Sequence, residues 1–166
     1  MICYFETYNN IYWTTEEIIK SNPNLAHFAD LYEVATNAED YYMYATTWTV
    51  FAPTDEAFEN AGLAIDAVSD YSAIRLLVFH EVFNQTLTTS DLNCDAGDNL
   101  IEMGSKQATR TICSKDNPIG QKGGGNDGPA LFVGDEIVGC DGVVQIIDQV
   151  LFPPSTVRWY SGLDLD

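Results

Sequence analysis

The chain has 166 residues, and its 25 acidic and 7 basic side chains give it a formal net charge of −18. This balance argues against binding to nucleic acid or anionic membranes, since both depend on Lys and Arg side chains, and no apolar run approaches the roughly 20 residues needed to span a bilayer. With 46% apolar residues the chain is too hydrophobic for a disordered acidic tail, so we expect a single folded domain.

Two short helices are predicted near the N-terminus. Thr14 and Glu17 have the spacing of a capping box, in which the hydroxyl and the carboxylate satisfy the first free backbone amides of a helix. We expect this helix to end before Pro23, because the residue before a proline disfavours helical geometry. Apolar residues then recur at helical spacing and predict a second helix over residues 25–35.

A buried strand followed directly by a helix is predicted next. Residues 48–52 are aromatic and β-branched, and Pro53 ends the strand because it has no backbone donor. Thr54 or Asp55 then caps a helix whose first turn is acidic, which suits the positive end of the helix dipole. A further amphipathic helix is predicted over residues 72–80.

The second half of the chain has the pattern of short strands. They are predicted at residues 85–88, 100–103, 108–113, 130–133, 137–138 and 143–151. Asp141-Gly142 favours a tight hairpin turn, and the glycine-rich residues 122–126 lack the pattern of a phosphate loop, so we expect a mobile loop there. Helices followed by a run of strands predict an α+β fold.

Cysteine usage favours an oxidising compartment. The four cysteines are Cys3, Cys94, Cys113 and Cys140, and their irregular spacing argues against zinc. Two disulfides can be arranged in three ways. We favour Cys94 with Cys113, which closes a short loop, and this leaves Cys3 with Cys140. Asn84 stands in the only N-glycosylation sequon of the chain, which also favours an extracellular protein.

The titratable residues suggest no catalytic site. His27 and His80 are the only histidines. We expect His80 to be a core histidine whose ring bonds the backbone or the Thr54-Asp55 turn, and His27 to lie on the polar face of its helix. No pair of nucleophile and base is apparent, so we expect neither an enzyme nor a bound cofactor.

Residues 91–102 are a near miss to a calcium loop. Oxygen ligands stand at positions 1, 3, 5 and 12 of such a loop, namely Asp91, Asn93, Asp95 and Glu102. Ala96 occupies position 6, where the sharp turn requires glycine. We therefore expect a solvated acidic loop that is at most a weak calcium site, with no dedicated metal centre.

Three motifs resemble the signatures of the fasciclin domain family. Residues 49–58 read TVFAPTDEAF and are similar to its first signature, and residues 76–82 resemble its second, an apolar helix that ends in Tyr-His. Residues 141–151 resemble its closing strand. Three residues depart from the family pattern: Phe79, Asp141 and Gln145. The motifs stand in the family's order and at the separation that one such domain requires.

The resemblance implies a compact α+β fold, a twisted β-sandwich or wedge with helices packed on one side. In this fold the strand at 49–52 pairs with the closing strand. It implies a fasciclin-like domain over residues 11–154, an N-terminal extension over 1–10 and a C-terminal tail over 155–166. Cys140 and the glycine-rich stretch are similar to fasciclin domains of algae and other photosynthetic eukaryotes.

The resemblance also implies a function. Fasciclin domains are mostly secreted or cell-surface modules that mediate cell adhesion or extracellular-matrix contacts, with cell-surface or matrix proteins or glycans as partners and self-association as a further possibility. The segments that bind integrins in some animal members correspond here to Phe79, His80, Glu136 and Ile137, and both pairs are altered. The alternative is a carrier of a lipophilic small molecule such as a carotenoid, which some algal proteins of similar fold are.

Overall fold

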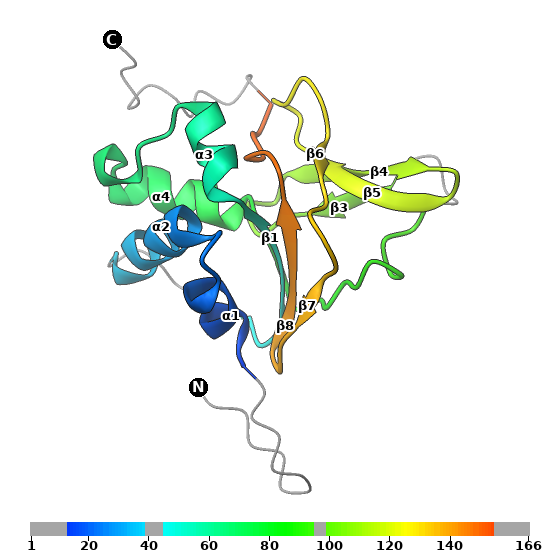
Figure 1. Cartoon of the computed structure of the whole chain (residues 1–166), viewed down its shortest axis with the longest axis horizontal. Coiled ribbons are helices and arrows are strands. Elements are labelled where there is room, and N and C mark those ends of the chain that lie inside the picture. Colours follow the sequence, from blue (N-terminus) through cyan, green and yellow to red (C-terminus); the bar gives the residue numbers. More distant parts are fainter. Residues whose placement is uncertain (1–12, 39–44, 95–98, 155–166) are drawn as a thin grey trace, which may run out of the picture.

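Helices and strands occupy opposite sides of the molecule in a computed structural model that describes residues 13–38, 45–94 and 99–154 (Figure 1). The helices in these ranges are α1 (Thr15–Ser21), α2 (Ala26–Asn37), α3 (Asp55–Ala61), the 3-10 helix η1 (Ile65–Ala67) and α4 (Asp70–Val78). None of them is long and apolar enough to cross a membrane.

Two four-stranded sheets make up the β part. The first has the order β2-β1-β8-β7 and is formed by β1 (Trp48–Pro53), β2 (Glu81–Phe83), β7 (Ile137–Val138) and β8 (Gly142–Ile147). The second has the order β3-β4-β5-β6 and is formed by β3 (Leu100–Glu102), β4 (Ala108–Ser114), β5 (Asn117–Lys122) and β6 (Ala130–Leu131). This arrangement confirms the predicted α+β class.

Strands β1 and β8 lie at the centre of the first sheet and run parallel, while the other strand pairs are antiparallel. Trp48 is paired with Gly142 at one end of the ladder and Pro53 with Ile147 at the other. The expected pairing of the early strand with the closing strand is therefore confirmed. Because parallel neighbours end at the same edge of a sheet, the residues after both strands are brought together.

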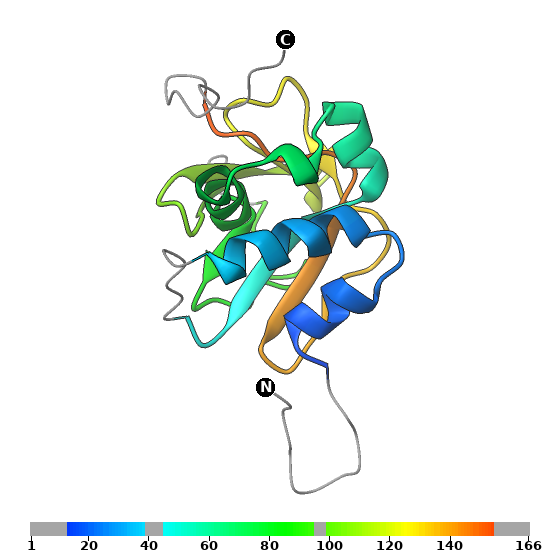
Figure 2. The ribbon, with the colours of Figure 1, turned by 90° about the vertical axis from the view of Figure 1, so that its left-hand side faces the viewer.

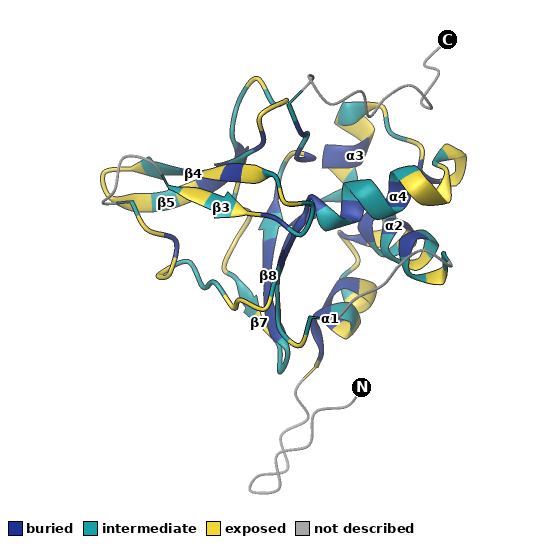
Figure 3. Ribbon diagram, turned by 180° about the vertical axis from the view of Figure 1, so that it is seen from behind, coloured by how far each residue is buried: buried dark blue, intermediate teal, exposed yellow. Residues whose placement is uncertain are grey.

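Two hydrophobic cores form on opposite faces of β1, since successive side chains of a strand point to opposite sides. Val50 and Ala52 face the helices and belong to the first core. Phe51 faces the second sheet and belongs to the second core, with Phe79 and Ile147. Figure 2 shows the helices in front of the first sheet, and Figure 3 shows its central strands as buried. The first sheet is thus covered on both faces.

Local signals place the helix starts. Thr14 and Glu17 form the predicted capping box, with the Thr14 amide donating to the Glu17 carboxylate at 2.8 Å. Of the two candidates for the cap of α3, Thr54 takes the role by accepting a bond from the Ala57 amide. Helix α4 is capped by Ser69 and ends at Val78, so it begins and ends two residues earlier than predicted.

Several strand predictions need correction. Residues 85–88 form no ladder, because the Thr49 hydroxyl binds the Gln85 carbonyl and the Leu87 amide in place of a neighbouring strand. Strand β5 was not predicted from the sequence, since Pro118 and Gly120 are poor strand formers. The short strand β2 was likewise missed, because it has only three residues and follows α4 almost directly.

Candidate functional site

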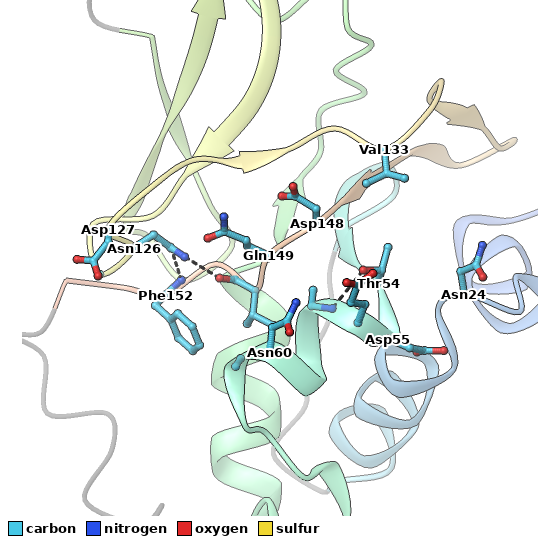
Figure 4. A pocket seen from close by; sticks show the side chains of 15 residues that line it. Asn24, Thr54, Asp55, Asn60, Asn126, Asp127, Val133, Asp148, Gln149 and Phe152 are labelled. Carbon is cyan, nitrogen blue, oxygen red and sulfur yellow. Dashed lines mark hydrogen bonds between the residues drawn. The ribbon is translucent and has the colours of Figure 1, made fainter.

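A pocket of about 910 Å³ lies where the parallel strands β1 and β8 end (Figure 4). Thr54 and Asp55, which follow β1, lie on one side of it, and Asp148 and Gln149, which follow β8, lie on another. The remaining lining residues come from α3, from the loop between β5 and β6, from Val133 after β6, from the C-terminal segment at Val150 and Phe152, and from Asn24 ahead of α2. Segments far apart in sequence therefore build one pocket, within the size range of small-ligand sites.

The wall between the glycine-rich loop and the C-terminal segment is held by Asn126. Its side-chain amide donates to the Val150 carbonyl at 2.8 Å, and its oxygen accepts from the Phe152 amide at 2.7 Å. A Cβ on Gly123 would come within 2.3 Å of the Phe152 carbonyl oxygen, and one on Gly125 within 2.2 Å of that of Pro153. The loop that we expected to be mobile is instead closely packed, and glycine is required for the approach.

The opposite wall is fixed by the start of α3. The Asp55 amide donates to the Asn24 carbonyl at 2.9 Å, and the Asp55 carboxylate accepts from the His27 amide at 2.8 Å. The His27 ring nitrogen Nδ1 lies 3.5 Å from the same carboxylate oxygen. Asp55 thereby satisfies a free amide in the first turn of α2, where a negative charge is also favourable.

The lining of the pocket is polar and carries only negative charge. Four carboxylates contribute to it, those of Asp55, Glu56, Asp127 and Asp148. No Lys, Arg or His side chain is among the residues that line it. Such a site repels anions and favours ligands that donate hydrogen bonds. From the sequence alone this pocket was missed, because only the strand pairing brings its segments together.

The predicted interaction residues Phe79 and His80 are fully buried. The His80 ring lies between the two cores, with Nδ1 2.8 Å from the Leu76 carbonyl and Nε2 accepting from the Leu151 amide at 2.9 Å. Since a backbone N–H only donates, Nε2 is the acceptor and Nδ1 carries the proton. Burial lowers the pKa of His80 to about 4. The structure places His80 as a core histidine, and a direct role in binding a partner stays a prediction.

Glu136 and Ile137, the second predicted pair, lie at the edge of the first sheet. The Glu136 carboxylate accepts hydrogen bonds from both the backbone amide and the hydroxyl of Thr89. These bonds lower its pKa. The amide of Gln145 lies 3.4 Å from the same carboxylate oxygen, so this departure from the family pattern has a partner within the fold. Ile137 is half-buried in β7 and packs against the first core.

The disulfide favoured from the sequence is present between Cys94 and Cys113. Cys140 is also disulfide-bonded. Cys3 lies outside the described residues, so its pairing with Cys140 stays a prediction. No free cysteine is present in the part of the chain that the structure describes.

The sequon residue Asn84 is exposed at the end of β2. Its backbone adopts a left-handed conformation with φ of 57°, which asparagine tolerates better than most residues. Its side-chain oxygen accepts from the Thr46 amide at 3.0 Å. The side-chain nitrogen, to which a glycan would be attached, is not used in that bond. Glycosylation of Asn84 stays a prediction.

Two of the four calcium candidates, Asp91 and Glu102, are engaged in other contacts. Asp91 accepts bonds from the amide and hydroxyl of Thr88, which lower its pKa. Glu102 forms an exposed ion pair with Lys106 at 3.1 Å. Asp95 lies outside the described residues. Within residues 13–38, 45–94 and 99–154, no three His, Cys, Asp or Glu side chains are grouped closely enough to hold a metal ion.

Comparison with known proteins identifies the fold. A search of curated proteins finds no match. Among solved structures, the FAS1 domain pair from the insect cell adhesion molecule Fasciclin I is similar, with a TM-score of 0.66 and 14% identity. The match covers 88% of this chain and 53% of that one, so this chain spans about half the length of its structural relative. The family model of the Fasciclin domain matches residues 23–153. The chain therefore belongs to the Fasciclin domain family.

Proposed function

We propose that this chain is a secreted or cell-surface module that mediates cell adhesion or extracellular-matrix contacts through proteins or glycans. The observation that supports it most is the Cys94–Cys113 disulfide, together with the absence of a free thiol in the described residues. Disulfides persist in oxidising compartments and are rare in the cytosol. The insect relative of the same fold is named as a cell adhesion molecule, which agrees with this function.

The net charge and the exposed sequon are consistent with an extracellular role. A charge of −18 keeps an adhesive surface soluble and limits non-specific contacts with other acidic molecules. Asn84 is accessible to modification, as an N-glycan requires. Neither feature indicates a reaction, and we propose no enzymatic activity.

Intact-mass measurement of the protein from its native source tests the compartment. Alkylation before reduction should add nothing, and alkylation after reduction should add four groups. A glycosidase should remove mass from Asn84. Four thiols that react without reduction would contradict secretion. Adhesion itself is tested with beads coated with the protein, which should bind cells or matrix from the same source, whereas beads coated with the unfolded, reduced chain should not.

A lipophilic carrier is the second candidate function, favoured by an apolar groove between α1 and β7. The groove has a volume of about 500 Å³, and its apolar lining is formed by Trp13, Ile18, Pro23, Ile137 and Val138. The exposed fractions of Trp13 and Val138 are 49% and 61%, unusually large for apolar side chains. A pigment retained through purification, seen as a visible absorption band, would support this function. Val138→Asp should abolish the band.

A further inference from the structure

The pocket beyond β1 and β8 offers polar groups that the fold itself does not use. The side-chain amides of Asn24 and Asn60 make no hydrogen bond within the described residues, and neither do the carboxylates of Glu56 and Asp127. These side chains are exposed, and they come from the segment before α2, from α3 and from the loop between β5 and β6. Their polar atoms are therefore available to a ligand.

Two other lining side chains use only part of their hydrogen-bonding capacity within the fold. The Asp148 carboxylate accepts from the Leu131 amide through Oδ1, which leaves Oδ2. The Gln149 amide donates to the Pro129 carbonyl at 3.2 Å, which leaves its oxygen and its second hydrogen. Both side chains are thereby oriented before any ligand binds, so little rotamer entropy remains to be lost.

The mixture of groups suits a ligand rich in hydroxyls. A hydroxyl donates one hydrogen bond and accepts others, so it matches carboxylates that only accept and amides that do both. Val133, which is 43% exposed, adds apolar surface beside these groups, where the C–H face of a sugar ring can rest. In a preformed site, polar groups that are already in place fix the orientation of the ligand.

Charge narrows the class of ligand. Four carboxylates and no basic side chain line the pocket, which disfavours uronates, sulfated sugars and phosphates. The carboxylates do not form a metal site, since the described residues contain no such grouping. The ammonium groups of a basic peptide would satisfy the carboxylates and the amide oxygens of Asn24 and Asn60. They only donate, however, so they would leave the amide hydrogens of both residues without a side-chain acceptor, whereas a hydroxyl both donates and accepts.

We propose that this pocket binds a neutral saccharide. The inference rests on the proposed adhesive function and specifies one of its contacts, a neutral glycan on a cell surface or in a matrix. Asn24, Asn60 and Gln149 bind its hydroxyls through their amides, and Glu56, Asp127 and Asp148 accept from them.

The test is an NMR titration of the full chain with neutral tetrasaccharides of galactose, glucose and mannose, followed through the side-chain amide signals of asparagine and glutamine. At least one should shift the signals of Asn24, Asn60 and Gln149, and oligogalacturonate should shift none. Asn60→Ala should weaken that binding by about tenfold, the loss expected for one hydrogen bond. Glu59→Ala, an exposed change on the same helix outside the pocket, should leave it unchanged.

Three results would overturn the proposal. They are an absence of shifts with every neutral tetrasaccharide, binding that survives Asn60→Ala, and a response to tetralysine alone, which would assign the pocket to a basic protein. The bead assay separates this failure from failure of the adhesive function. If the beads adhere but no saccharide binds, the adhesive function stands, and only the assignment of the pocket to a saccharide is wrong.

Discussion

The ring nitrogen Nε2 of His80 accepts a hydrogen bond from the backbone amide of Leu151 at 2.9 Å. This bond joins the end of α4 to the C-terminal segment within the buried interior. Phe28 lies against the ring, with 5.8 Å between the ring centroids, so helix α2 is tied to the same point. Protonation of Nε2 would set its N–H against the N–H of Leu151, and two donors cannot bond each other. The pKa of His80 therefore affects the stability of the fold.

We predict that stability falls as the pH is lowered from 6.5 towards 4. The pKa of His80 is about 4 in the folded chain and near 6.5 when unfolded, so in this window only the unfolded state takes up the proton. The loss should reach about 3 kcal/mol at pH 4. Urea unfolding between pH 4 and 8 measures it. His80→Gln should be less stable at pH 8 and should show a flatter profile, whereas an equally steep profile would assign the effect to carboxylates.

Two buried glutamines should respond in opposite ways to the same substitution. Gln121 is fully buried, and neither its amide nitrogen nor its oxygen has a hydrogen-bond partner within the described residues. Gln145 is equally buried but bonds the Leu87 carbonyl and the Glu136 carboxylate. Gln121→Met should therefore raise the free energy of unfolding by about 1 to 2 kcal/mol, and Gln145→Met should lower it by a similar amount.

Denaturant unfolding of both variants against the parent chain gives these values. Destabilisation by Gln121→Met would show that an internal water satisfies the amide, because removal of the side chain would then break real bonds. A stabilised Gln145→Met would contradict the assigned network around Glu136.

The turn between β4 and β5 should be improved by residues that suit its backbone. Ser114 pairs with Asn117, so Lys115 and Asp116 alone form the turn, with φ of 49° and 66°. Two-residue turns of this type favour Asn-Gly. Lys115→Asn with Asp116→Gly should add about 1 kcal/mol of stability.

Gly62 provides the matched reverse experiment. It ends α3 with φ of 66°, and a Cβ there would meet nothing within 4 Å. Gly62→Ala should cost about 1 kcal/mol for conformational reasons alone. Thermal unfolding of both variants measures the two effects. Equal melting temperatures for the turn variant and the parent would show that the turn is not strained.

Loss of the Cys94–Cys113 disulfide should destabilise the chain without changing its fold. The two cysteines are separated by 19 residues, a loop whose closure is worth about 3 kcal/mol. The double variant Cys94→Ala and Cys113→Ala should lose this amount in denaturant unfolding and keep the circular dichroism of the parent. The control is Thr88→Ala, which removes one exposed bond to Asp91 and should cost much less than loss of the disulfide. A loss no larger than this control would contradict a stabilising role.

Features set by neighbouring residues were predictable from the sequence. The capping box at Thr14, the cap at Thr54 and the end of β1 at Pro53 depend on contacts within a few positions. The core position of His80 followed from its place after an apolar stretch, although the identity of its partner did not. Leu151 is 71 positions away and reaches His80 only through the tertiary fold.

Features set by strand pairing were not predictable. The pocket depends on the parallel register of β1 and β8, since Asp55 and Asp148, which line it, follow these two strands. Two of the three departures from the family pattern likewise have partners that are distant in the sequence. Asp141 accepts from the Thr15 amide at 2.7 Å at the start of α1, and Gln145 meets Glu136. A single sequence contains no signal for such long-range pairs.

The central pair of strands also decides when this domain can fold in a cell. Residue 48 on β1 has residue 142 on β8 as its neighbour, so the middle of the first sheet stays incomplete until the ribosome has released nearly the whole domain. Until then β1 exposes an apolar strand with one side unpaired, the kind of edge that attracts other chains. Synthesis of this protein therefore includes an interval in which residues 48–53 are prone to pair with other chains.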